Sequence, residues 1–306
     1  MRGSILITAL WVLAFLSVLS ISLSTQASLQ IQGAGRIQHR IQETQIAWGN
    51  LEEAIARIRE ENQQTSRSGL GPQGSGIRIA EDRFEIQEEG KLSVNTAPAS
   101  VLAALIMEVG GLSTTAAEEV AEAIVDWRDP DDLPEPNGTE SATYQQLESP
   151  YPCRNAPLGS VEELLLIRGV TYELYQKLKG YVTVWGEGKV SLNSASPEVL
   201  KALGMSQGLV DRILLYRQGP DGMPQTADDA LFSSVGSFPS ELQRTVGLTP
   251  DQFSEASTFA ASGLVTVNSG LFEVRAFGQV PGNLRPRREI HSVVDSSGRI
   301  LAWREE

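Results

Sequence analysis

Residues 5–23 read ILITALWVLAFLSVLSISL, a run of 19 positions without a charged side chain. Only Thr8 and three serines interrupt its apolar character. About 20 apolar residues cross the hydrocarbon core of a bilayer as one α-helix. The run therefore predicts a membrane-spanning helix over residues 4–24. A cleaved secretory signal is the alternative, with residues 24–27 as a weak small-residue cleavage site.

The apolar pattern continues beyond this segment at helical spacing. Apolar residues recur three, four or seven positions apart and fall on one helical face, namely Ile37, Ile41, Trp48, Leu51, Ile55 and Ile58. No proline occurs before Pro72. We therefore expect one helix to about residue 63, with its first half in lipid and its second half against a domain. A membrane helix followed by a separate amphipathic helix is the alternative.

The body that follows is acidic and carries one thiol. The chain has 306 residues and a formal net charge of −13. Such a surface repels nucleic acid phosphates and suits hard cations better. Cys153 is the only cysteine, which excludes an intrachain disulfide, and we expect it to be a half-buried free thiol. Without a disulfide, a bound metal ion is one way in which long loops could be held in place.

Short alternating segments at both ends of the body predict an antiparallel sheet. Those before the centre are residues 77–79, 83–87 and 91–94, and those after it are 271–280, 289–294 and 299–303. Helical patterns lie between them. The expected fold is α+β, with a long N-terminal helix and first strands (25–95), a large all-α insertion, and C-terminal strands (264–306).

The insertion contains an internal duplication. Residues 91–105 (KLSVNTAPASVLAAL) align with residues 189–203 (KVSLNSASPEVLKAL), and eight of the fifteen positions are identical. Each copy then has two glycine-apolar-hydroxyl corners, at which glycine can end one helix and the hydroxyl can cap the next. We therefore expect two copies built from helical hairpins, at residues 96–188 and 189–263.

Each copy also carries an acidic loop between its hairpins, at residues 126–140 and 219–229. Calcium is bound by several carboxylate and carbonyl oxygens on a flexible loop. Acidic turns are often only solvated, but two such loops at equivalent repeat positions favour calcium binding.

The sequence contains none of the common hydrolase, zinc-protease or phosphate-loop motifs, and with two histidines we expect no enzyme. The corners also resemble helix-hairpin-helix DNA-binding modules. Those modules typically have a second glycine where this chain has Thr171 and Thr249, and no basic stripe accompanies the corners. A membrane-tethered DNA-binding protein therefore stays an alternative, with no nucleic acid partner expected.

The N-terminus resembles that of type IV pilins and type II secretion pseudopilins. Gly3 directly before an apolar helix is similar to a prepilin peptidase site, which implies a leader of residues 1–3 and a methylated Ser4 at the mature N-terminus. Most members have Glu at mature position five, where this chain has Thr8. That absence, the strands and the duplicated insertion together resemble the K-class minor pseudopilins (GspK family), whose helical-hairpin, SAM-like insertion interrupts a pilin-like sheet.

The resemblance implies a structural, non-catalytic protein at the tip of a periplasmic pseudopilus. There it would start and cap assembly with the I- and J-class minor pseudopilins, after contact with the prepilin peptidase and the inner-membrane secretion platform. It implies one pass through the inner membrane, with the N-terminus cytoplasmic and the body periplasmic. A minor pilin of a type IV pilus is the alternative. The calcium ligands that it implies are Asp129, Asp131 and Glu140 in the first loop, and Asp221, Asp228 and Asp229 in the second.

Overall fold

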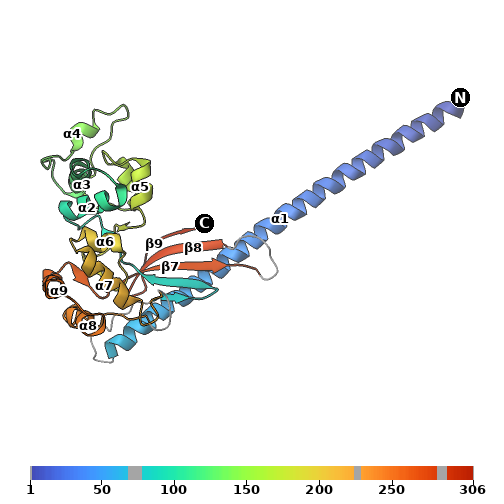
Figure 1. Ribbon diagram of the computed structural model, residues 1–306. Helices are drawn as coiled ribbons and strands as arrows, with labels where there is room; N and C mark the ends of the chain where they lie inside the picture. The colour runs from blue at the N-terminus through green and yellow to red at the C-terminus, as the bar shows by residue number, and fades with distance from the viewer. Residues whose placement is uncertain (1, 68–77, 224–228, 281–287, 306) are drawn as a thin grey trace.

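The computed structural model describes residues 2–67, 78–223, 229–280 and 288–305. Helix α1 (Arg2–Arg67) is a single long rod, and its N-terminal part projects away from the body (Figure 1). The side chains of Gly3, Ser4 and Thr8 lie outside the described residues. No helical stretch with described side chains is both long and apolar enough to count as a membrane span.

The body covers only the C-terminal part of α1. Its buried apolar side chains lie on one helical face, at Ala47, Leu51, Ala54, Ile55 and Ile58. Ile37 and Ile41 continue this face in the sequence, but they are 63% and 53% exposed. The predicted face is therefore a body contact only beyond about Glu43, and its earlier part is uncovered.

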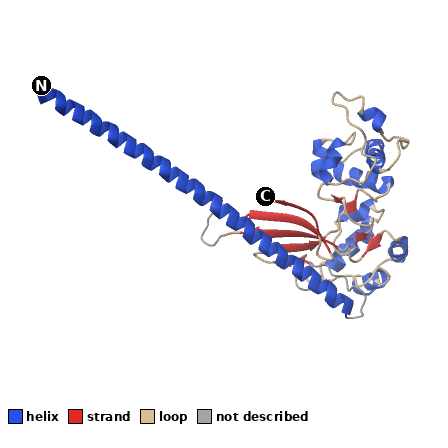
Figure 2. Ribbon diagram, turned by 180° about the vertical axis from the view of Figure 1, so that it is seen from behind, coloured by secondary structure: helices blue, strands red, loops and turns tan. Residues whose placement is uncertain are grey.

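A five-stranded antiparallel sheet packs against this part of α1, and it confirms the predicted α+β class (Figure 2). The strand order is β1 (Arg78–Ala80), β2 (Phe84–Glu88), β7 (Leu271–Gly278), β8 (Arg288–Asp295) and β9 (Ile300–Glu305). Inward-facing residues of the three central strands meet the buried face of α1, and they are Phe84, Ile86, Phe272, Val274, Ala276, Ile290 and Val294. Strands distant in the sequence thus share one core with the helix.

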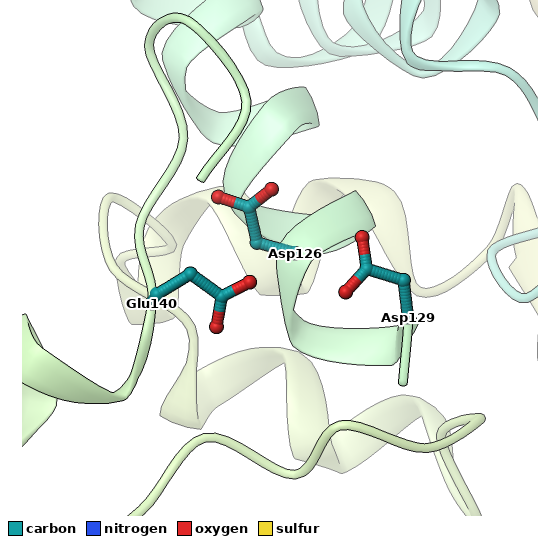
Figure 3. Close-up of side chains that lie close together, drawn as sticks. All are labelled: Asp126, Asp129 and Glu140. Carbon is teal, nitrogen blue, oxygen red and sulfur yellow. The ribbon is translucent and has the colours of Figure 1, made fainter. Parts of the chain in front are cut away.

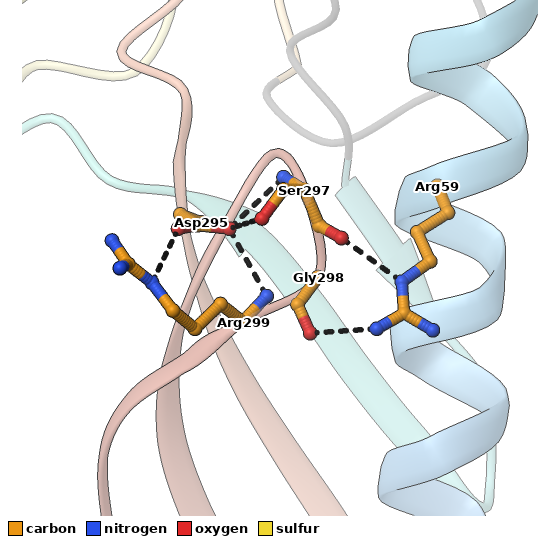
Figure 4. A network of polar contacts seen from close by, with 5 residues as sticks. All are labelled: Arg59, Asp295, Ser297, Gly298 and Arg299. Atoms are coloured by element: carbon orange, nitrogen blue, oxygen red, sulfur yellow. Dashed lines mark hydrogen bonds and ion pairs between the residues drawn. The ribbon is translucent and has the colours of Figure 1, made fainter.

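Two contacts hold α1 on the sheet, one between backbone atoms and one from a side chain to the backbone. A Cβ at Gly278 would lie 1.8 Å from the carbonyl oxygen of Glu43, so the end of β7 touches the helix backbone. Arg59 donates from Nε and Nη2 to the carbonyl oxygens of Ser297 and Gly298, each at 3.0 Å (Figure 4). Asp295 holds this turn by accepting from the backbone amide of Ser297 at 2.9 Å.

The helical insertion, residues 92–266, leaves the sheet after β2 and returns before β7. The first copy contains α2 (Ala99–Leu105), a π-helical turn η1 (Ile106–Gly110), α3 (Thr114–Arg128), α4 (Ser141–Tyr144), a 3-10 turn η2 (Val161–Leu166) and α5 (Tyr172–Leu178). The second contains α6 (Pro197–Ala202), α7 (Gln207–Arg217), α8 (Phe238–Thr245) and α9 (Pro250–Ser262). One apolar core runs through both copies.

The strand expected at residues 91–94 does not join the main sheet. Instead β3 (Leu92–Ser93) pairs in parallel with β4 (Val182–Thr183), and β5 (Val190–Ser191) pairs in parallel with β6 (Val265–Thr266). A parallel pair needs a long crossover connection, and here the helices of each copy supply it. Each copy is thus a closed unit that begins and ends in its own two-stranded ladder.

The predicted corners have the expected geometry. The four corner glycines have positive φ, at 73° for Gly111, 85° for Gly169, 97° for Gly204 and 69° for Gly247. The hydroxyl two residues after each glycine caps the next helix through its side chain, at Ser113, Thr171, Ser206 and Thr249. The duplication seen in the sequence is therefore repeated in the local backbone.

Candidate metal site

Three carboxylates converge where the first acidic loop leaves and re-enters the helical insertion (Figure 3). Asp126 lies in the last turn of α3, Asp129 follows that helix, and Glu140 immediately precedes α4. One oxygen of each lies within 4.8 Å of one oxygen of the others. Asp126 is fully buried and Glu140 is 5% exposed. We call this group the carboxylate cluster.

The loop is folded tightly around Asp126. Its Oδ1 accepts from the amide of Glu135 at 3.0 Å, and its Oδ2 accepts from the amide of Thr139. A Cβ at Gly138 would lie 2.0 Å from Oδ2, so only glycine leaves room for the carboxylate. Asp126 therefore binds the C-terminal part of the loop and so positions Glu140 beside the cluster.

The other two carboxylates have buried oxygens that lack a partner. Within the described part of the chain, Oδ1 of Asp129 and both carboxylate oxygens of Glu140 make no hydrogen bond. Burial, followed by the charges of Asp126, Asp129 and Asp132, raises the pKa of Glu140 to about 7. Burial is also the largest cause of the raised pKa of Asp126 and of Asp129. A cation would remove both the repulsion and the unsatisfied oxygens.

Asn155 adds a neutral oxygen close to the loop. Its side-chain amide donates to the carbonyl oxygen of Asp131 at 2.9 Å and to Oδ1 of Asp132 at 3.0 Å. Its own Oδ1 is buried and has no partner among the described residues. It is also the one non-glycine described with positive φ, at 49°. This backbone conformation is uncommon and is maintained by the surrounding contacts.

Aromatic rings of Trp127, Tyr144 and Tyr151 pack against one another next to the ends of α3 and α4. Trp127 lies edge-on to Tyr144 at 5.2 Å, and Tyr144 stacks on Tyr151 at 5.4 Å. Cys153 is buried beside them, and its Sγ donates to the carbonyl oxygen of Asp126 at 3.6 Å. Burial raises the pKa of this thiol to about 11, so it is a protonated packing residue at neutral pH.

The structure brings together only part of the predicted first ligand set. Asp129 and Glu140 belong to the cluster, whereas Oδ1 of Asp131 accepts from the amide of Leu133 at 2.9 Å outside it. Asp126 was not predicted as a ligand. The sequence feature that could have identified it is its three-residue spacing to Asp129, which places both residues on one side of a helix end.

The second predicted site stays a prediction. Asp228 lies outside the described residues. Asp221 accepts from the amide of Met223 at 2.7 Å, and Asp229 is exposed. Both therefore lie at the surface of the second copy.

The second copy satisfies its buried carboxylate in another way. Glu241 accepts from the hydroxyls of Tyr216 at 3.1 Å and Ser237 at 2.6 Å, and also from Ser233. Burial alone would raise the pKa of Glu241, but these donors together lower it. Protein hydroxyls thus supply here what the carboxylate cluster of the first copy lacks.

The chain that follows each acidic loop is held by equivalent asparagine side chains in the two copies. Asn95 donates to the carbonyl oxygens of Leu158 and Val184 and accepts from the amide of Leu158 at 2.7 Å. Asn193 makes the same set of bonds to Phe232 and Val267 in the second copy. We call these two residues the asparagine clamps. Asn95 thus holds the chain 18 residues after the first acidic loop ends at Glu140, and Asn193 holds it three residues after the second ends at Asp229.

Comparison with known proteins gives consistent matches. Residues 82–187 match the family described as Type II secretion system (T2SS), protein K. The putative type II secretion system protein K of Escherichia coli K12 is 24% identical over 63% of this chain and 65% of its own length. Type II secretion system protein K of Klebsiella pneumoniae is 30% identical over 67% of this chain and 58% of its own length. The matched stretch thus spans less than two thirds of either relative.

The fold also matches a solved structure. A chain in the crystal structure of the GspK-GspI-GspJ complex from the type 2 secretion system of enterotoxigenic Escherichia coli superposes with a TM-score of 0.56. The match covers 89% of this chain and 99% of that chain, at 16% sequence identity. With the family match over residues 82–187 and the curated relatives, the chain is recognised as a homologue of the type II secretion system protein K family.

Proposed function

We propose that the chain is a structural minor pseudopilin of the K class in type II secretion. The observation that carries this proposal is a duplicated helical insertion placed between β2 and β7 of a pilin-like helix and sheet. The family match, over residues 82–187, covers β2 and the first copy of this insertion.

The exposed face of α1 supports a role in assembly. Leu10, Phe15 and Leu19 are 62%, 66% and 45% exposed, and the exposed apolar positions continue to Ile37 and Ile41. Residues 5–23 have the length and composition of a membrane anchor. We propose that this face packs in the inner membrane and then on the helices of partner pseudopilins, after cleavage between Gly3 and Ser4 and delivery to the secretion platform.

The shape of the molecule supports a place at the tip. The helical insertion lies at the end of the molecule opposite to the N-terminal end of α1, beside the sheet (Figure 1). A pilus shaft stacks similar subunits closely, and this added width would obstruct the next subunit. We propose I- and J-class minor pseudopilins as the partners, because the solved complex that this fold resembles is named for GspK, GspI and GspJ.

A calcium ion in the first acidic loop is the second part of the proposal. Asp126, Asp129 and Glu140 would hold it, and the buried unpaired oxygens of Asp129 and Glu140 support this. Hard carboxylate oxygens suit calcium, and the bound ion would cross-link the end of α3 to the start of α4. Its role would be structural, since it would neutralise a loop that is otherwise held against charge repulsion.

A pull-down of the full chain in detergent with I- and J-class partners tests the function. We expect a stable ternary complex, and Ile41→Asp should weaken it because a charge would enter the exposed apolar face of α1. Gln42→Asp is the matched control, since Gln42 is exposed beside it. Failure to capture either partner would contradict the proposal. Tight, salt-sensitive binding to DNA in a parallel gel shift would favour the DNA-binding alternative.

A further inference from the structure

The connection between the sheet and the helical insertion contains two adjacent buried carboxylates that the proposed function does not use. Glu88 ends β2 and Glu89 follows it, and they are 1% and 5% exposed. One oxygen of each, Oε2, is buried without a hydrogen-bond partner in the described part of the chain. We call residues 88–90 the joint.

Glu88 contacts the second copy and the returning chain. Its Oε1 accepts from the amide of Ser269 at 2.5 Å. The hydroxyls of Ser191 in β5 and of Ser269 lie near this carboxylate and act to lower its pKa. The charged group facing it is Arg217 of α7. Arg217 also donates to the carbonyl oxygen of Ala195 at 2.6 Å, so its guanidinium group does not serve Glu88 alone.

Glu89 contacts the first copy. The hydroxyl of Thr183 in β4 lies near it and acts to lower its pKa, and Lys91 and Glu273 are the charged groups that face it. Lys91 is already ion-paired with Glu273 of β7, which reduces the charge that it offers to Glu89. The two neighbouring carboxylates therefore face different copies of the insertion, and among the described residues neither has an ion pair of its own.

Gly90 fixes the joint against the second copy. A Cβ at Gly90 would lie 2.3 Å from the carbonyl carbon of Ser194 and 2.4 Å from the amide nitrogen of Ala195. The chain at the joint is thus in direct backbone contact with the turn before α6. This close contact leaves no room beside Gly90, so hydration of the neighbouring Glu88 and Glu89 would move the insertion relative to the sheet.

We propose that Glu88 and Glu89 make the joint a proton-sensitive hinge, which is closed when the two carboxyls are protonated and loosens when both are ionised. A protonated carboxyl needs little hydration and can remain in this dry contact. Two carboxylates there carry charge in a dry contact and have unsatisfied oxygens, so water entry and movement of the insertion become favourable.

The direction of the pH effect follows from burial. Burial raises the pKa of Glu88 to about 7 and that of Glu89 to about 7, from an ordinary value of 4.5. Between about pH 4.5 and about pH 7, the folded joint therefore binds more protons than the unfolded chain does. Its stability is therefore full below about pH 4.5 and is lost as the pH rises through about 7.

Hydrogen exchange of the full chain in detergent tests the hinge. We expect residues 88–94 and 266–271 to exchange faster at about pH 8 than at about pH 5.5, after correction for intrinsic rates. Glu88→Gln with Glu89→Gln keeps the shape of both side chains without ionisation. In that variant the two segments should stay protected at both pH values.

Glu85→Gln is the matched control, because Glu85 lies on the same strand but pairs with Arg275 at 2.5 Å at the surface. It should retain the pH response of the unsubstituted chain. Equal protection at both pH values in the unsubstituted chain would overturn the proposal, as would an unchanged pH response in the double variant. If the double variant does not fold, each single variant should show a reduced response, and a full response in both would overturn it equally.

Discussion

Gly138 lies so close to Asp126 that a Cβ on it would be 2.0 Å from Oδ2 of the aspartate. Gly138→Ala should therefore push the loop off Asp126 and misplace Glu140. We expect a loss of about 1–3 kcal/mol in unfolding free energy, as for other overpacked sites. We also expect the melting temperature to lose its response to calcium. Thermal melting in calcium and in chelator measures both.

Gly180→Ala is the control for that substitution. Gly180 lies in the same copy, and a Cβ there would contact nothing within 4 Å. It should leave both the stability and the calcium response unchanged. A Gly138→Ala variant with the unsubstituted calcium response would show that the loop does not need this close contact.

The ligand set can be tested by comparing two aspartates of the same loop. Asp126→Asn should weaken calcium binding by at least about tenfold, because the cluster loses a charge and the support for Glu140. Asp131→Asn should have a much smaller effect, since its carboxylate bonds to the amide of Leu133 outside the cluster. Titration calorimetry measures both. The reverse order of effects would support the ligand set implied by the sequence resemblance.

Features with a period or a repeat were predictable from the sequence. The long helix follows from the spacing of Leu51, Ile55 and Ile58, which are buried as expected. The two copies follow from the alignment of residues 91–105 with 189–203. These signals are local, so they do not depend on where distant parts of the chain lie.

Features that depend on contacts between distant parts of the chain could not be predicted from the sequence. Asp126 begins the acidic loop in the sequence, but its contact with Gly138 and Glu140 appears only when that loop folds back to it. The ladder between β3 and β4 has two residues in each strand, too few to show a strand period. The uncovered position of Ile41 likewise depends on where the sheet ends, which no helical pattern records.

Arg59 should contribute to holding α1 on the sheet. Arg59→Ala removes two donors to the turn at Ser297 and Gly298, and we expect a loss of about 1 kcal/mol because the side chain is partly solvated. Arg57→Ala is the matched control two residues earlier, whose contact with Glu81 is a 3.8 Å surface ion pair. It should change the stability little. Urea unfolding followed by circular dichroism measures the difference, and equal losses would contradict the assigned role of Arg59.

The asparagine clamps allow the two copies of the insertion to be tested separately. Asn95→Ala and Asn193→Ala each remove three bonds to the backbone, so each should cost about 1–3 kcal/mol in unfolding free energy. Only Asn95 fixes Leu158, three residues after Asn155 beside the carboxylate cluster. Asn95→Ala should therefore also weaken calcium binding to the first loop, whereas Asn193→Ala should leave that affinity unchanged. Titration calorimetry on both variants measures this, and an equal loss of affinity would show that the two copies respond as one body rather than loop by loop.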